Sequence, residues 1–216
     1  MRVLVINPNS TGSMTEGIVA AARTAAVPDI EIDGLTNADA PPAIQGEEDG
    51  RAAAPGVIAA CQDAAGKGYG AAIIACFDDT ALAEARTAAT IPVIGIGQAA
   101  FLAAMLFGRF SVITTLPVSV PVIEGNIDAY GMSGACAKVR ASGLPVLSLE
   151  QDPEKAQETL SACAAAAARE DQCQALVLGC AGMAPFGPAM TETSGLPTID
   201  GVAAAVGLAR TVLRAS

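Results

Sequence analysis

The 216-residue sequence contains no histidine. Without an imidazole base, the chain cannot form a Ser-His-Asp triad or a Cys-His catalytic pair. The same absence excludes metal sites with histidine ligands, and no two of the six cysteines stand in a C-x-x-C arrangement. We therefore expect no metal site.

Basic residues are scarce as well. The chain has 12 lysines and arginines against 22 acidic residues, for a net charge of -10 at pH 7. No basic stripe is available to neutralise phosphates, so nucleic acid is excluded as a partner. No apolar run reaches the roughly 18 residues of a membrane span, and the apolar run after Met1-Arg2 is too short for a secretory signal. We expect a cytoplasmic protein with reduced thiols and no membrane association.

Two apolar runs that each end at a cysteine are the most informative feature present. Residues 71–76 end at Cys76, and residues 175–179 lead into Cys180. A continuous apolar run of this length is typical of a buried strand in a parallel sheet. Because ligands bind beyond the carboxyl ends of such strands, each run places a thiol where chemistry would occur.

Strands and helices alternate along the chain, and their order repeats once. Cys180 follows Cys76 by 104 positions, Leu196-Pro197 follows Ile91-Pro92 by 105, and Thr114 follows Asn7 by 107. The sequence therefore predicts an α/β protein of two domains related by a pseudo-twofold axis. Each domain would hold a four-stranded, mostly parallel sheet flanked by helices, with the active site in the cleft between the domains. We assign residues 1–97 and about 203–216 to the first domain, and 98–202 to the second.

The expected strands lie near residues 2–6, 30–35, 71–76, 91–96, 110–115, 135–141, 175–179 and 196–199. Several local signals accompany them. A capping box from Ser13 to Glu16 would begin the first helix. Pro55 would kink or shorten the second. Asp78 or Asp79 would cap a helix over 80–88, and Asp152 one that runs to about Glu170.

Two facing thiols can invert a carbon acid without a cofactor. A thiolate on one face removes the α-proton, and the neutral thiol on the other face supplies one. Helix starts after Cys76 and Cys180 would lower the pKa of both thiols. Backbone N–H groups of residues 77–79 and 181–183 would stabilise the enolate oxygen. The remaining cysteines are interpreted as small buried hydrophobes: Cys61, Cys136, Cys163 and Cys173.

Three segments carry a resemblance to a known family: Asn7-Pro8-Asn9-Ser10, Ala75-Cys76-Phe77-Asp78-Asp79 and Leu178-Gly179-Cys180-Ala181-Gly182-Met183. They resemble the hydantoin and allantoin racemases of the aspartate/glutamate racemase superfamily. The resemblance implies two pseudo-symmetric α/β domains, no cofactor, and Cys76 and Cys180 as the acid/base pair. It implies substrate contacts at Asn9, Ser10, Pro42, Ile44, Phe77, Asp78, Thr114, Thr115, Ala181 and Gly182. We also expect a small-molecule substrate and a homo-oligomer.

The residues after each cysteine depart from the superfamily's amino-acid racemases, in which Asn-Thr, and Thr-Glu or Thr-His, hold the substrate carboxylate. Phe77-Asp78 and Ala181-Gly182 stand there instead, and they suit a flat neutral ring better. The substrate is therefore expected to be a 5-substituted hydantoin, allantoin or a similar cyclic carbon acid. A maleate-type cis-trans isomerase and an aspartate/glutamate-type racemase remain alternatives, and so does a two-lobed binding protein that is not an enzyme.

Three further features have a structural and a functional interpretation. Asn9 and Ser10 could cap the first helix, contact the ligand, or do both. Phe77 could serve packing alone. Residues 95–100 fit a G-x-G-x-x-A dinucleotide pattern, but the next strand ends at Thr114-Thr115 and carries no acidic residue for the ribose. Close packing of helix against strand accounts for these glycines.

Overall fold

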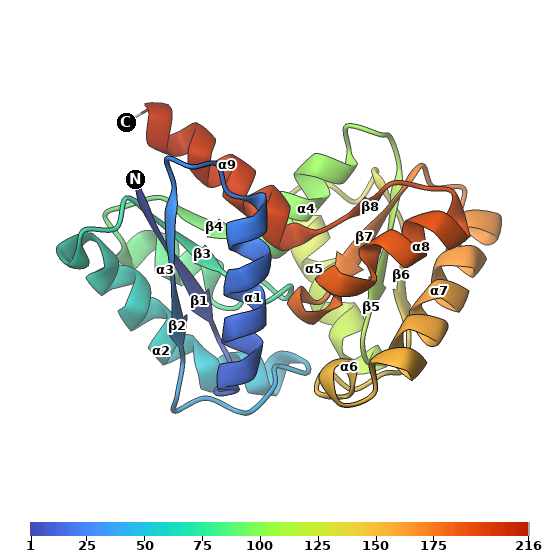
Figure 1. The fold of residues 1–216 in the computed structure, drawn as a ribbon, viewed down its shortest axis with the longest axis horizontal. Coiled ribbons are helices and arrows are strands. Elements are labelled where there is room, and N and C mark those ends of the chain that lie inside the picture. Colours follow the sequence, from blue (N-terminus) through green and yellow to red (C-terminus); the bar gives the residue numbers. More distant parts are fainter. Residues whose placement is uncertain (216) are drawn as a thin grey trace.

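A computed structural model describes residues 1–215, which form two α/β halves side by side (Figure 1). Ser216, the last residue of the expected first domain, lies outside the described residues. The first half contains the strands β1 (Arg2–Asn7), β2 (Glu31–Thr36), β3 (Ala71–Ile74) and β4 (Val93–Gly95). The second half contains β5 (Phe110–Thr114), β6 (Cys136–Ala141), β7 (Ala175–Gly179) and β8 (Thr198–Ile199).

Helices connect consecutive strands in both halves. Those of the first half are α1 (Gly12–Ala25), α2 (Glu47–Ala64), the 3₁₀ turn η1 (Ala65–Lys67) and α3 (Leu82–Ala88). Helix α4 (Ile96–Ala104) joins the two sheets. The second half adds η2 (Pro117–Ser119), α5 (Val120–Ala129), α6 (Ser148–Gln151), α7 (Pro153–Glu170), η3 (Ala181–Phe186), α8 (Gly187–Ser194) and α9 (Gly201–Ala215). No helix among residues 1–215 is both long and apolar enough to cross a membrane.

The two sheets have the same topology. Their strand orders are β2-β1-β3-β4 and β6-β5-β7-β8, and every pair is parallel. The expected α/β class and the two four-stranded parallel sheets are therefore confirmed. Apolar side chains on both faces of each sheet form the core, and β3 and β7 are buried along their whole length.

The last helix returns to the first sheet. Val202 and Val206 of α9 pack in one buried cluster with Val3 and Val5 of β1. In Figure 1 this helix lies beside the first half although it ends the chain. The proposed division of the chain into domains, with α9 added to the first, remains a prediction.

Three expected local signals are wrong. Helix α1 begins at Gly12 without a side-chain cap, and the Ser13 hydroxyl instead donates a hydrogen bond to Glu150 in the second half, 2.9 Å away. Helix α2 runs continuously from Glu47 to Ala64 through Pro55, so the expected shortening is wrong, while the expected kink stays a prediction. Neither Asp78 nor Asp79 caps α3. By contrast, Asp152 caps α7 by accepting the Lys155 N–H.

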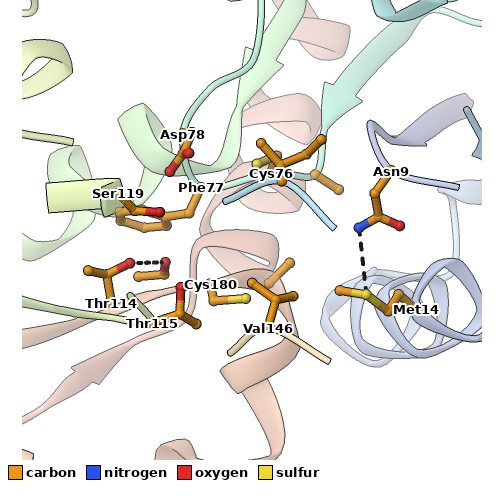
Figure 2. Close-up of a pocket in the computed structure, with 14 residues that line it drawn as sticks. Asn9, Met14, Cys76, Phe77, Asp78, Thr114, Thr115, Ser119, Val146 and Cys180 are labelled. Carbon is orange, nitrogen blue, oxygen red and sulfur yellow. Dashed lines mark hydrogen bonds between the residues drawn. The ribbon is translucent and has the colours of Figure 1, made fainter. Parts of the chain in front are cut away.

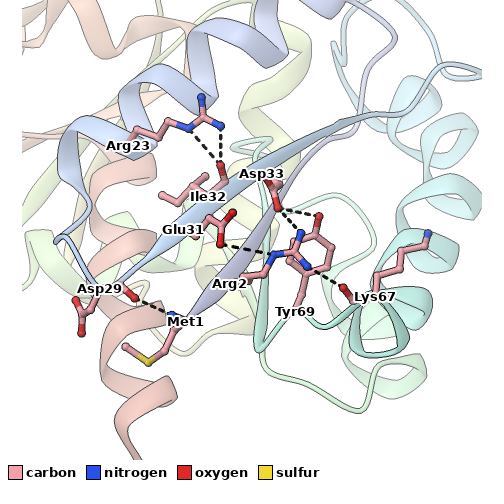
Figure 3. Close-up of polar contacts among 9 residues, drawn as sticks. All are labelled: Met1, Arg2, Arg23, Asp29, Glu31, Ile32, Asp33, Lys67 and Tyr69. Carbon is pink, nitrogen blue, oxygen red and sulfur yellow. Dashed lines mark hydrogen bonds and ion pairs between the residues drawn. The ribbon is translucent and has the colours of Figure 1, made fainter.

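A polar cluster fixes the amino-terminal end of the first sheet (Figure 3). The Arg2 guanidinium donates to Asp33 at 2.6 Å and to the Lys67 carbonyl at 2.9 Å, and it lies over the Tyr69 ring. The Tyr69 hydroxyl donates to the same Asp33 carboxylate. These groups all have partners at the sheet edge opposite the cysteines, so their role is structural.

Asp79 joins the two halves. Its carboxylate accepts the N–H groups of Gly97 and Gln98 at 2.9 and 2.8 Å, so it caps α4 from 18 residues away. The Tyr130 hydroxyl of the second half donates to the same carboxylate at 2.8 Å. A Cβ at Gly97 would lie 2.5 Å from the Phe77 carbonyl oxygen, which explains this glycine. The carboxylate thus occupies the N–H groups that a dinucleotide phosphate would require.

Replacing Asp79 should destabilise the whole fold. Asp79→Ala removes three charge-assisted hydrogen bonds, so we expect the free energy of unfolding to fall by about 3 kcal/mol in urea denaturation. Asp152→Ala, which removes an exposed cap, is the matched control and should cost about 1 kcal/mol. Equal losses in the two variants would contradict a special role for Asp79.

Candidate active site

A pocket lies where the carboxyl ends of the two sheets face each other. The cavity left between the side chains is small, about 30 Å³. Its lining comes from both halves: Asn9, Met14, Ile44, Ala75, Cys76, Phe77, Asp78, Thr114, Thr115, Ser119, Val146, Gly179, Cys180 and Ala181.

Both cysteines predicted from the strand pattern line this pocket. Cys180 follows the last residue of β7 directly, and Cys76 lies two residues beyond the end of β3. In Figure 2 the two thiols lie in the middle of the pocket, with Asn9 and Met14 on one side and Asp78 and Ser119 on the other. The arrangement can therefore present two thiols to one bound molecule.

Close packing of β7 against β5 fixes the position of Cys180. A Cβ at Gly179 would lie 2.7 Å from the Ile113 carbonyl oxygen, so only glycine allows the two strands to approach this closely here. The Thr114 hydroxyl donates to the Gly179 carbonyl at 3.1 Å. Gly179 and Thr114 thus fix the backbone from which the Cys180 side chain extends.

The expected lowering of the cysteine pKa values is wrong. Burial raises the pKa of the Cys180 thiol to about 11, although the Gly182 N–H, which favours the thiolate, works against this. Burial, and then the negative charge of Asp78, raise the pKa of Cys76 well above its ordinary value. Helix α3 begins only at Leu82, too far to offset the desolvation of Cys76. Both shifts favour the neutral thiol.

Asn9 is held in place by a network at the carboxyl end of β1. Its side-chain oxygen accepts hydrogen bonds from the Asn7 amide and from the Thr11 N–H, both at 2.9 Å. Its own amide group points along the pocket toward the Met14 sulfur, 3.6 Å away. The side chain therefore caps the turn before α1 and still presents a donor to the pocket.

The structure brings most of the predicted substrate-contact residues together and leaves three aside. Those on the pocket wall are Asn9, Ile44, Phe77, Asp78, Thr114, Thr115 and Ala181; those outside it are Ser10, Pro42 and Gly182. The Ser10 N–H binds the Pro41 carbonyl, and the Pro42 carbonyl accepts the Thr11 hydroxyl, so this region holds a loop in place. Phe77 also packs edge-on against the Phe101 ring.

Sequence reasoning missed Met14, Ser119 and Val146, all of which line the pocket. The internal repeat contains the signal that could have found them. Met14 and Ser119 stand near the start of the helices that follow β1 and β5, and Ile44 and Val146 lie in the loops after β2 and β6. The two halves thus contribute matching positions to one site.

The pocket lining contains no lysine or arginine, and Asp78 is its only carboxylate. Among residues 1–215, no group of three or more histidine, cysteine or acidic side chains is arranged to hold a metal ion. Chemistry by the residues present therefore centres on the two thiols, one carboxyl group and several hydroxyl and amide donors.

Comparisons with known proteins agree with this architecture. The Asp/Glu/hydantoin racemase family pattern matches residues 3–209. A hydantoin racemase from Rhizobium meliloti is 44% identical over all of this chain and 90% of its own length. The structure of an allantoin racemase from Klebsiella pneumoniae superposes with a TM-score of 0.95 at 38% identity, covering 100% of this chain and 88% of that one.

A more distant structure shares the fold alone. A glutamate racemase from Francisella tularensis, 16% identical, superposes with a TM-score of 0.75 over 99% of this chain and 81% of its own. The family pattern and the close relatives span nearly the whole sequence, including both halves and both cysteine segments. The chain therefore belongs to the Asp/Glu/hydantoin racemase family and is an isomerase of the racemase type.

Proposed function

We propose that this racemase inverts the α-carbon of 5-substituted hydantoins, allantoin or a similar cyclic carbon acid, with Cys76 and Cys180 as alternating acid and base. The observation that carries the proposal is a single pocket lined by both thiols, one from each half. The activities named for the hydantoin and allantoin racemases that are 44% and 38% identical support the substrate class.

In the proposed reaction, the substrate carbon lies between the two sulfurs. The thiolate of one cysteine takes the α-proton, and the C–H electron pair passes into the ring carbonyl to form an enolate. The thiol of the other cysteine then protonates the opposite face of the carbon and becomes the thiolate. One proton is removed and one is added, and the reverse reaction exchanges the two roles.

Hydrogen-bond donors are present for the enolate oxygen. The Asn9 amide and the hydroxyl groups of Thr115 and Ser119 belong to the lining, and their neutral dipoles can stabilise developing negative charge in a site of low polarity. Asn9 is already oriented by Asn7, so little reorganisation is needed during the reaction.

The pocket favours a neutral ring over the two alternative substrate types. Maleate and free aspartate or glutamate carry carboxylates, whose charge would lie in the same pocket as the Asp78 carboxyl group with no lysine or arginine in the lining to offset it. A hydantoin ring is uncharged near neutral pH and avoids that repulsion.

Solvent hydrogen should enter the substrate during inversion. In D₂O we expect deuterium at the α-carbon of every inverted molecule, followed by NMR and polarimetry after subtraction of spontaneous exchange. Cys76→Ser and Cys180→Ser should each lower the racemisation rate at least about 100-fold. Cys163→Ser, outside the pocket, is the control and should retain activity. Inversion without deuterium uptake would overturn the mechanism.

Thiol reactivity should follow the raised pKa values. Because the Cys180 pKa is about 11, the thiolate fraction in the free enzyme rises about tenfold per pH unit throughout the neutral range. Alkylation of Cys180 by iodoacetamide, followed by mass spectrometry of its peptide, should therefore accelerate from pH 7 to 9.5 without levelling off. Levelling off between about pH 8.5 and 9.5 would show an ordinary, solvated thiol.

A further inference from the structure

Asp78 carries a partly buried carboxyl group to which the proposed thiol mechanism assigns no role. It lines the pocket, and its Oδ2 atom is inaccessible to solvent and has no hydrogen-bond partner among residues 1–215. An unpartnered buried carboxylate oxygen carries a large desolvation cost. Such an atom at the wall of a ligand pocket is most simply explained by a partner that arrives with the ligand.

The backbone around Asp78 is fixed from both sides. The Asn126 amide of α5 donates to the Asp78 carbonyl at 2.8 Å, and the neighbouring Asp79 is tied to α4 and Tyr130. The Asp78 side chain therefore leaves a rigid segment, and Figure 2 shows it at the pocket wall near Ser119. A carboxyl group held in this way can fix the orientation of a bound ligand.

The surroundings of Asp78 leave its charge without compensation. Burial, followed by the charge of Asp79, raises its pKa to about 7. The Asp78 charge also raises the pKa values of Cys76 and Cys180, so it acts on both thiols. The Asp78 carboxyl group therefore has no cation beside it, and its Oδ2 atom has no donor among residues 1–215.

Asp78 also breaks the match between the halves. The position 104 residues later, which corresponds to it, is Gly182, a residue outside the pocket lining. Several other pocket positions do come from both halves in matching pairs, such as Cys76 with Cys180 and Ile44 with Val146. A carboxyl group on one side alone distinguishes the two ends of a bound ring.

We propose that Asp78 determines substrate specificity and orientation by accepting a hydrogen bond from a ring N–H of the cyclic substrate. This inference rests on the proposed function and deepens it. A lactam or imide N–H supplies a donor to the Asp78 carboxyl group, whereas a free carboxylate in its place would meet like charge. The substrate class is thus a neutral ring with at least one N–H that can reach Asp78.

Methylated substrates test the assignment. We would compare kcat/KM for a 5-substituted hydantoin and for its 1-methyl and 3-methyl derivatives. Circular dichroism of the substrate monitors the racemisation. In the wild-type enzyme, methylation of the nitrogen that faces Asp78 should lower kcat/KM roughly 10- to 100-fold. In Asp78→Ala and in Asp78→Leu, which retains volume without an acceptor, that penalty should fall to about twofold. Asp78→Asn keeps one acceptor oxygen, so this variant should keep most of the loss in kcat/KM that methylation causes.

Two controls separate the possible failures. Asp63→Ala, an exposed carboxylate outside the pocket, should leave the methylation penalty unchanged. Thermal melting should show that Asp78→Ala and Asp78→Leu are folded. If the wild-type enzyme racemises the parent hydantoin but both variants keep the full penalty for each methyl position, the assignment of Asp78 is wrong while the proposed function stands. If the wild-type enzyme racemises neither the parent hydantoin nor its two methyl derivatives, both the proposed function and the assignment of Asp78 are wrong.

Discussion

The hydrogen bonds of the Asp79 carboxylate connect the halves from which the site is built. A single side chain after β3 holds the amino end of α4 and the hydroxyl group of Tyr130. The segment just before it carries Cys76, Phe77 and Asp78, so the same bonds fix three pocket residues relative to the second sheet. Stacking of Phe101 on Phe110 continues this junction into the core.

Both halves share one topology, and the pocket is therefore lined by corresponding segments from each half. Each sheet places a cysteine just beyond its third strand in chain order, and the loops and helices beside it supply matched neighbours. Desolvation raises the pKa of both thiols and so favours their neutral forms.

Much of this architecture could be predicted from local sequence, because long apolar runs define buried strands regardless of context. All eight strands lie within about two residues of the expected positions, and Cys76 and Cys180, singled out by strand ends and matched spacing, both line the pocket. The failures concern properties that only tertiary packing creates. Asp79 finds its partners 18 to 51 residues away, the thiol pKa values follow from burial, and Ser13 bonds to Glu150 across the halves.

Asp78 in the first half corresponds in position to Gly182 in the second half, and this difference affects the kinetics of the proposed reaction. Because one half carries a carboxyl group where the other has glycine, the two thiols experience unequal fields and the two enantiomers meet different bases. Yet mirror-image substrates have equal free energies, so the equilibrium constant must remain one. Any difference in kcat between the enantiomers must therefore be balanced by an equal ratio of their KM values, so the asymmetry can alter flux at saturation but never the final composition.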